Sequence, residues 1–432
     1  MSVPFRFIHA ADLHLDSPFK GLGEAPPAVR QALADSTFEA LRRLTAAAVS
    51  AKADFVLLAG DLFDAADRSL RAQAVLHQQW AKLREHGIGV YVIHGNHDPL
   101  SGQRARFAEM EGVHVFGAEQ YEGRPAYRKD GELAAFVYGM SYARRAVTDN
   151  LAARYRPAAA APFHIALLHG NVDGDPSHDP YAPCTLGELA GAGFDYWALG
   201  HVHDRRVLHT YPHVVYSGNT QGRHPRETGA KGCYIVDVAA DKAVELTFAP
   251  LDAVRWTAIQ VEIAGVREEA ALLDRLEAAC DRAAAEAEDR PLMAALTLTG
   301  AGPLHARLTE ASYRVDLLHA LRERSAASGR DPEANEAWLW VYNLEAGTMP
   351  ETDLARLAGE DSFAGELYRL ARRIAADPEE SRTLAAEAMA PMNDHPQLRR
   401  LLREWRLTGE EELVSRAALR LAGMLATEEE SE

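Results

Sequence analysis

The sequence predicts an α/β fold, because short apolar runs alternate with amphipathic stretches through the first half of the chain. Strands are expected at Phe5–Ala11, Phe55–Ala59 and Val90–His94, with helices at Ala28–Ala51 and Ser69–Glu85 between them. This alternation is typical of buried, mostly parallel sheets that are covered by helices.

The next strands are separated by shorter loops, which indicates that the sheet becomes mixed. We expect them at His164–Leu168, Tyr196–Leu199, Val214–Tyr216, Gly232–Val238 and Val244–Phe248.

The character of the sequence changes after residue 254, where the α/β region, residues 1–254, is predicted to end. Residues 255–350 are predicted to form a small α+β domain, with strands at Thr257–Ile263, Met293–Leu298 and Trp338–Leu344 and helices at Glu268–Glu288 and Ala311–Arg324. Residues 351–432 have a helical pattern, with helix starts predicted at Asp377 and Thr408.

The composition is that of an ordinary globular protein: 432 residues, 47% of them hydrophobic and 25% charged, with a net charge of −17. These values exclude a disordered or collagen-like chain. Three cysteines without metal-binding spacing indicate free thiols in a reducing compartment. No signal peptide is evident at the start, and no stretch is apolar enough to span a membrane. We therefore expect a cytoplasmic protein that does not contact membranes.

Polar residues come directly after five of the predicted strands, which is where ligands bind in open α/β sheets. They are Asp12 and His14, Asp61 and Asp64, Asn96 to Asp98, His169, and His201 with His203. Each fragment alone could be a surface turn, but five of them at strand ends indicate one metal site. Carboxylates, an amide and imidazoles form a mixed oxygen and nitrogen set, which suits Mn, Fe or Zn. The glycines before Asp61, Asn96 and His201 permit sharp turns near the metals.

The order of these fragments resembles that of the calcineurin-like metallophosphoesterases, over residues 4–254. Within that superfamily, Phe7–His14 and Gly60–Asp64 resemble the SbcD-type DNA repair exonucleases. The run Ser217–His224, with Glu227–Gly229 and Lys231–Tyr234, is most similar to the bacterial YhaO-like subgroup. The resemblance implies a four-layer metallophosphoesterase sandwich, in which helices flank two mixed sheets, followed by a small capping domain and a helical region.

The resemblance also implies a centre with two divalent metal ions, with manganese as the expected metal and iron or zinc as alternatives. The implied ligands of the first ion are Asp12, His14, Asp61 and His203, and those of the second are Asp61, Asn96, His169 and His201. Two ions that share a carboxylate can clamp the attacking and leaving oxygens at phosphorus. His97 fits neither set, so we expect it to assist at the phosphate or the leaving group, with Asp98 orienting its ring.

Other residues carry weaker signals. Arg223, His224 and Arg226 follow a strand beside the presumed site, where contact with DNA phosphates and a solvated turn are equally good interpretations. His178 is expected to be a loop residue rather than a ligand. Some family members have a histidine that positions phosphate where this chain has Asp64, and an ionised Asp64 cannot donate to phosphate.

We predict a metal-dependent DNA exonuclease or endonuclease that acts in DNA repair. Two alternatives stay open: a phosphodiesterase for a small nucleotide or lipid-linked substrate, and a mainly structural subunit that binds DNA ends. The complete ligand set argues against the structural role. The regions after residue 254 argue against a minimal small-molecule enzyme.

The resemblance further implies that the helical region docks onto an SMC-like coiled-coil ATPase. Apolar residues recur at helical spacing in three segments, which suits either such docking or burial within the same chain. They are Phe363, Leu367, Leu370 and Ile374; Leu398, Leu401, Leu402 and Trp405; and Val414, Ala417, Leu421 and Met424 or Leu425. The predicted partners are DNA and an ATPase of this type, and a homodimer is left open.

Overall fold

The computed structural model describes residues 3–19, 24–64, 69–101, 110–157, 161–175, 178–351 and 354–393, together with residues 414, 417, 418, 420 and 421. The chain divides into two compact units. The first comprises residues 1–257, 284–293 and 329–342, and the second comprises residues 258–283, 294–328 and 343–432. The predicted boundaries near residues 254 and 350 stay predictions.

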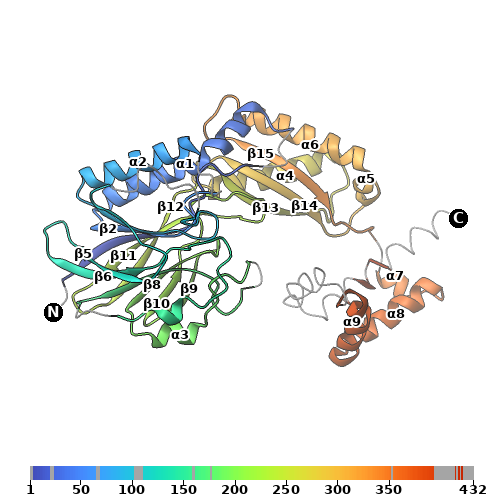
Figure 1. Ribbon diagram of the computed structural model, residues 1–432. Helices are drawn as coiled ribbons and strands as arrows, with labels where there is room; N and C mark the ends of the chain where they lie inside the picture. Colours follow the sequence, from blue (N-terminus) through green and yellow to red (C-terminus); the bar gives the residue numbers. More distant parts are fainter. Residues whose placement is uncertain are drawn as a thin grey trace. The chain divides into compact units, whose positions relative to one another are not determined.

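The first unit contains two six-stranded mixed sheets (Figure 1). The first sheet has the order β12-β11-β1-β2-β3-β4, in which β1 to β4 are parallel and β11 and β12 are paired antiparallel. Its strands are β1 (Phe5–Ala10), β2 (Phe55–Ala59), β3 (Gly89–Ile93), β4 (Val113–Val115), β11 (Gly232–Val238) and β12 (Val244–Pro250).

The second sheet has the order β5-β6-β7-β8-β10-β9, with β6, β7, β8 and β10 parallel and an antiparallel strand at each edge. Its strands are β5 (Glu122–Tyr127), β6 (Leu133–Gly139), β7 (His164–His169), β8 (Tyr196–Gly200), β9 (Arg206–Thr210) and β10 (His213–Tyr216). Both sheets therefore direct the carboxyl ends of several parallel strands into loops that carry polar residues.

Helices cover the outer face of each sheet, which gives four layers. Helices α1 (Pro27–Ser50) and α2 (Leu70–Glu85) lie along the first sheet in Figure 1, and their apolar side chains are buried against it. The 3-10 helix η1 (Ala152–Arg154) and helix α3 (Leu186–Gly191) pack on the second sheet. Between the sheets lies a core rich in aromatic rings, including the stacked pair Phe7 and Phe55. This arrangement confirms the predicted four-layer sandwich of two mixed sheets and helices.

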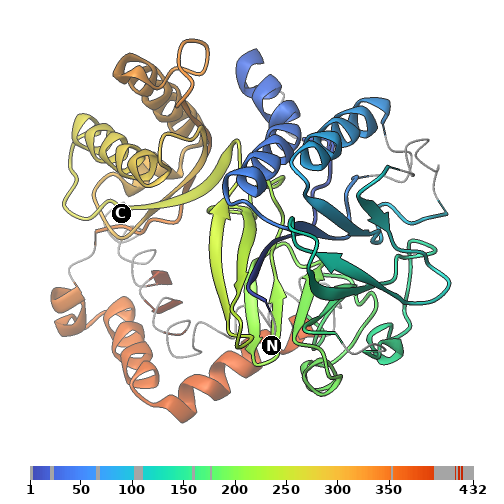
Figure 2. The same cartoon turned by 90° about the vertical axis from the view of Figure 1, so that its left-hand side faces the viewer.

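The chain after β12 forms a three-stranded sheet with the order β13-β14-β15. Its elements are β13 (Arg255–Glu262), α4 (Glu269–Glu286), β14 (Leu292–Thr299), α5 (His305–Thr309), α6 (Ala311–Ser325), η2 (Ala326–Arg330) and β15 (Leu339–Ala346). Helices α4 and α6 lie side by side along this sheet in Figures 1 and 2, and Arg324 of α6 contacts Asp274 of α4 at 2.6 Å.

A helical region follows, as the sequence predicts: α7 (Leu354–Gly359), α8 (Phe363–Ala375) and α9 (Pro378–Asn393). The predicted helix start at Asp377 is confirmed, because its Oδ1 accepts hydrogen bonds from the backbone amides of Glu379 and Glu380 at 2.9 and 3.1 Å. Thr408 and the apolar segment at residues 398–405 lie outside the described residues, as do Met424 and Leu425. In the described part of the chain, the helices are too short or too polar to cross a membrane.

Candidate metal centre

The loops after five parallel strands bring all seven predicted metal ligands together. They are Asp12 and His14 after β1, Asp61 after β2, Asn96 after β3, His169 at the end of β7, and His201 and His203 after β8. All except His203 are at least 95% buried. Because β1 to β3 belong to one sheet and β7 and β8 to the other, the centre lies where the carboxyl ends of both sheets meet.

Backbone strain is concentrated at these ligands. Asp12, His14, Asp61 and His201 have φ angles of 53°, 43°, 51° and 96°, in the region that residues with a Cβ seldom adopt. Such conformations cost of order 1–3 kcal/mol each and persist where the surrounding structure enforces them, typically at functional sites. Their clustering at four of the seven ligands supports a functional centre, on grounds that are independent of side-chain chemistry.

Three glycines leave room for the ring of His169, and a Cβ on one of them, Gly200, would overlap the carbonyl of Ala59 and lie 2.9 Å from Nδ1 of His169. A Cβ on Gly60 or on Gly95 would overlap that ring, and one on Gly95 would also overlap the carboxylate of Asp61. Gly60 has in addition a φ of 97°, which glycine adopts without penalty. The sharp turn expected before Asp61 is therefore present, whereas Gly95 is required by close packing.

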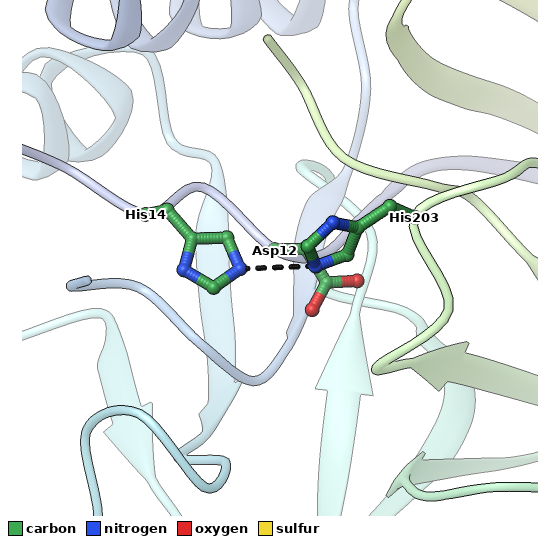
Figure 3. Close-up of side chains that lie close together, drawn as sticks. All are labelled: Asp12, His14 and His203. Carbon is green, nitrogen blue, oxygen red and sulfur yellow. Dashed lines mark hydrogen bonds between the residues drawn. The ribbon is translucent and has the colours of Figure 1, made fainter. Parts of the chain in front are cut away.

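One half of the centre consists of Asp12, His14 and His203, which Figure 3 shows converging from the loops after β1 and β8. The Nε2 atoms of His14 and His203 face each other at 3.2 Å. When neither nitrogen carries a proton, two such atoms can both bind one cation. The donor set of this half is therefore two imidazole nitrogens and a carboxylate.

The other half consists of Asn96, His169 and His201. Oδ1 of Asn96 lies 3.0 Å from Nε2 of His169 and 3.2 Å from Nδ1 of His201. Oδ2 of Asp61 lies between the halves, 3.3 Å from Nε2 of His169 and 3.8 Å from Nε2 of His14. Asp61 thus has the position that a shared ligand requires.

The electrostatics of the centre fit cation binding. Asp12 and Asp61 are each 1% exposed, and their ion-pair partners are imidazoles. Burial raises the pKa of Asp12. Burial would also raise the pKa of Asp61, but the neighbouring His169 outweighs it and holds that pKa well below its usual range. Buried carboxylates with oxygen and nitrogen ligands around them are typical of divalent-metal sites.

His169 is the protonated partner of the ionised Asp61. Burial disfavours its charged form, but the charge and hydrogen bond of Asp61 outweigh burial and raise the pKa of His169 to about 9. By contrast, burial lowers the pKa of His201 to about 3. Because a metal-binding imidazole is neutral, binding of a cation at His169 would release this proton.

His97 lies at the rim of the centre, and its ring is not oriented as predicted. Its Nδ1 is 2.8 Å from the backbone carbonyl of Asp64, and its amide donates to Oδ1 of Asp61 at 2.9 Å. The carboxylate of Asp98 instead contacts Nδ1 of His94 at 2.8 Å. Asp98 is fully buried and also accepts the amides of Leu62 and Gly95, so its described contacts stabilise the loops after β2 and β3.

Several residues that contact the ligands were not predicted to do so. Oε1 of Glu227 lies 2.7 Å from Nδ1 of His203, and the carbonyls of Ala59 and Asp179 lie 2.9 and 2.8 Å from Nδ1 of His169 and Nε2 of His201. These contacts fix which nitrogen of each imidazole faces the centre. The only sequence signal for Glu227 was its place in the run after β10, and backbone carbonyls carry no sequence signal.

His178 also lies closer to the centre than expected. It is a loop residue, as predicted, but its ring centroid is 5.4 Å from that of His201 and 5.2 Å from that of His203. Its Nε2 is 3.4 Å from the backbone amide of His203. The loop that carries it is fixed by Asn171, whose Oδ1 accepts the amide of Asp175 at 2.6 Å. Position in a Gly/Asp/Pro-rich loop could not reveal this packing.

The three predicted DNA contacts differ in exposure. His224 and Arg226 are exposed, whereas the side chain of Arg223 is only 15% exposed and its guanidinium is paired with Asp64 and bonded to Oγ of Ser17 at 3.1 Å. Burial opposes the charge of Asp64, but the adjacent imidazole of His14 and the charge of Arg223 lower the pKa of Asp64 to about 2. Asp64 is therefore ionised and engaged within the protein, and the proposed phosphate contacts stay predictions.

Comparison with known proteins gives matches to both halves of the chain. Residues 5–205 match the calcineurin-like phosphoesterase family, and residues 256–349 match the middle domain of metallophosphoesterase YhaO. The chain is 40% identical over 369 residues to the uncharacterized metallophosphoesterase YhaO of Bacillus subtilis, which is 85% of this chain and 87% of that protein.

More distant relatives include archaeal proteins. The DNA double-strand break repair protein Mre11 of Methanopyrus kandleri is 26% identical over 299 residues, 63% of this chain and 62% of that protein. Mre11 of Methanocaldococcus jannaschii is 25% identical over 250 residues, 54% of this chain and 63% of that protein. The chain thus spans less than two thirds of the length of either archaeal protein.

Proposed function

This chain belongs to the calcineurin-like metallophosphoesterases, and on that premise we propose that it is a nuclease that uses two divalent cations to hydrolyse phosphodiester bonds of DNA in repair. Family membership makes it a phosphoester hydrolase. The observation that carries the proposal is the convergence of seven side chains in which one oxygen of Asp61 faces imidazoles of both halves.

The metal centre explains how the chain would cleave a phosphodiester. Two divalent cations, proposed to be manganese, would supply the Lewis acidity that activates water and neutralises charge at phosphorus. Asp12, His14 and His203 would hold one cation, Asn96, His169 and His201 the other, and Asp61 would contact both. The contacts with Glu227, Ala59 and Asp179 keep three of the four imidazoles, His203, His169 and His201, in the tautomer this requires.

His97 is the proposed proton donor. Because its Nδ1 is bonded to the carbonyl of Asp64, the Nε2 atom is left to face a substrate. Its ring stands edge-on to His14, with centroids 4.7 Å apart, and is partly exposed while Asn96 and Asp98 on either side are buried. In the protonated form, Nε2 can donate to a phosphate oxygen or to the leaving oxygen.

DNA as the substrate rests on similarity and on the exposed basic residues. Two of the relatives are named as double-strand break repair proteins, and the chain shares the order of ligands that the nuclease resemblance implies. The exposed His224 and Arg226 would contact DNA phosphates close to the centre. We propose that this activity takes place in the cytoplasm.

The direct test is an assay of the purified full chain with Mn²⁺ against labelled duplex DNA, labelled single-stranded DNA and bis-p-nitrophenyl phosphate. We expect cleavage of DNA that EDTA abolishes and Mn²⁺ restores. Turnover of bis-p-nitrophenyl phosphate without any DNA cleavage would support the alternative, a phosphodiesterase for small substrates. Binding of DNA ends without cleavage of any substrate would support the structural alternative.

We also propose that α8 binds an SMC-like coiled-coil ATPase. Phe363 and Leu370 on this helix are 71% and 40% exposed, whereas Ala364 and Tyr368 are buried with Leu357 of α7. Amphipathic helices commonly place such an apolar stripe in a groove of a partner. The exposed apolar side chains support docking by α8, and the other two apolar segments are not part of the proposal.

A further inference from the structure

Each imidazole of the metal centre has one nitrogen that faces the predicted cation and one, here called the outer nitrogen, that points away from it. The two halves of the centre differ in what contacts the outer nitrogen. In the half that contains His169 and His201, both outer nitrogens meet backbone carbonyls, at 2.9 and 2.8 Å. In the half that contains His14 and His203, both outer nitrogens meet carboxylates. Nδ1 of His203 is 2.7 Å from Oε1 of Glu227, and Nδ1 of His14 is 3.3 Å from Oδ1 of Asp64.

This difference has an energetic consequence. A carbonyl fixes the tautomer of an imidazole, but a carboxylate also brings a full negative charge, which makes the ligand nitrogen more basic and stabilises a bound cation. Hydrogen bonds to charged groups are about twice as strong as neutral ones. The half with His14 and His203 also has the carboxylate of Asp12 where the other half has the amide oxygen of Asn96. Both differences favour tighter cation binding there, so Glu227 accounts for only part of the expected difference in affinity.

Both carboxylates are held in place by the same residue. The backbone amide of Arg223 donates to Oε2 of Glu227 at 2.7 Å, and its guanidinium pairs with Asp64. Oε2 of Glu227 also accepts from Nδ2 of Asn219 at 2.9 Å. The loop after β10 therefore fixes Oε2 of Glu227, and Oε1 contacts Nδ1 of His203.

The contact of His14 with Asp64 is less regular than the contact of His203 with Glu227. Nδ1 of His14 and Nε of Arg223 are both buried without a well-aligned hydrogen bond in the described structure, and the carboxylate of Asp64 lies between the two side chains. The contribution of Asp64 to the orientation of His14 is accordingly smaller than that of Glu227 to His203.

We propose that Glu227, supported by Arg223 and assisted by Asp64, is a positioning residue that makes the His14 and His203 half the tighter of the two cation positions. The inference rests on the two-cation centre of the proposed function but not on its substrate. It predicts that one cation binds first and stays bound, while the other, backed only by carbonyls, exchanges more readily.

The test is a calorimetric Mn²⁺ titration of the full chain without DNA, with electron paramagnetic resonance to count free Mn²⁺. Wild type should show one tight and one weaker site. Glu227→Gln should weaken the tight site by about 10–100-fold and leave the weaker one unchanged. The matched control is Glu122→Gln, which removes another carboxylate paired with an imidazole, His114 at 3.0 Å, and should change neither site.

Three results would overturn the proposal: equal affinities in wild type, equal weakening of both sites in Glu227→Gln, or no change in that variant. If Glu227→Gln does not fold, Asp64→Asn replaces it and should weaken the tight site alone, by less. Unequal sites that respond as expected in a protein that cleaves no DNA would uphold this inference and refute the nuclease. A chain that binds no Mn²⁺ would refute both.

Discussion

The metal centre and helix α8 differ in how many of their side chains have contacts within the chain itself. In the centre, each imidazole that faces a predicted cation has its outer nitrogen beside a carboxylate or a carbonyl of the same unit. On α8, Phe363 is 71% exposed, although the opposite face of the helix is buried. The side chains of the centre thus have their partners within the chain, whereas α8 exposes apolar side chains. Catalysis and partner binding should therefore be separable by mutation.

The largest separation is expected from Asp61→Asn. Loss of the shared carboxylate should lower metal content at both positions and reduce cleavage of DNA and of bis-p-nitrophenyl phosphate to background, since both halves depend on Oδ2. Co-purification with the ATPase should stay as in wild type. Elemental analysis that finds two metal ions retained, together with near-wild-type turnover, would contradict the bridging role.

His97→Ala should reduce activity without changing metal content. Turnover should fall by roughly 10²–10⁴-fold, the usual scale for loss of a general acid. The reason is that His97 contacts the centre through its backbone amide, which the substitution keeps, while only the ring is lost. A parallel fall in bound metal would identify His97 as a ligand instead.

Replacing Phe363 and Leu370 together by Asp should have the opposite effect. Association with the cognate ATPase should weaken by at least about tenfold, the equivalent of about 1.4 kcal/mol, while Mn²⁺-dependent cleavage of bis-p-nitrophenyl phosphate is unchanged. Leu70→Asp is the matched control, because Leu70 is 83% exposed on α2 of the first unit. If the double variant and the control bind the ATPase equally well, α8 is not the docking helix.

The smallest effect concerns the stability of the metal-free protein. The pKa of Asp64 is about 2 in the fold against 3.8 for the reference carboxyl, so the unfolded chain takes up a proton first as pH falls. The stabilisation by Asp64 is thus fully present above about pH 5 and is lost as pH falls toward 2. Its size should be at most about 1 kcal/mol, because the group keeps contact with solvent.

Denaturant unfolding in EDTA, from pH 6 to pH 3, measures this contribution. Wild type should be more stable than Asp64→Asn at pH 6, and the gap should narrow toward pH 3. A difference in the free energy of unfolding that stays constant over this range would show that the charge of Asp64 contributes nothing to folding. The contacts of the centre would then stabilise the metal-free protein less than their geometry indicates.

The strands of the two sheets and the polar residues at their ends were predictable because strong local signals coincide, whereas the four-layer arrangement and the assignment of ligands to each cation were implied by the family resemblance. Apolar runs mark the central strands, and a polar residue directly after such a run needs no tertiary information to be placed at the edge of a sheet. Strands β2 and β11 were predicted with their observed bounds. The helix of residues 28–51 was predicted within one residue of α1.

Of the elements that were missed, β6 does carry an apolar run, LAAFVYG, whereas the edge strands β5 and β9 lack that signal. Strand β5, Glu122–Tyr127, is an edge strand with exposed polar residues and Pro125, and β9 is an edge strand of which most residues are exposed. Proline and polar residues are typical of edges but also of loops, so pattern alone cannot distinguish them. Helix α3 did have a usable signal, a capping box of Thr185 and Glu188.

Within the centre, the sequence could name ligands but not what orients them. Glu227 is 24 residues from His203, and Asp179 acts through its backbone, so both contacts exist only in the folded chain. The same reason applies to Asp98: adjacency in sequence suggested His97 as its partner, whereas its described contacts, with two backbone amides and His94, appear only in the folded chain.

The measurement that tests the metal centre most directly is anomalous X-ray diffraction from crystals of the full chain grown with Mn²⁺. Two anomalous peaks are expected, with one oxygen of Asp61 between them. One peak should be bound by Nε2 of His14 and His203, and the other by Nε2 of His169 and Nδ1 of His201. A single peak, a peak away from Asp61, or coordination through the opposite nitrogen of His201 or His203 would contradict it.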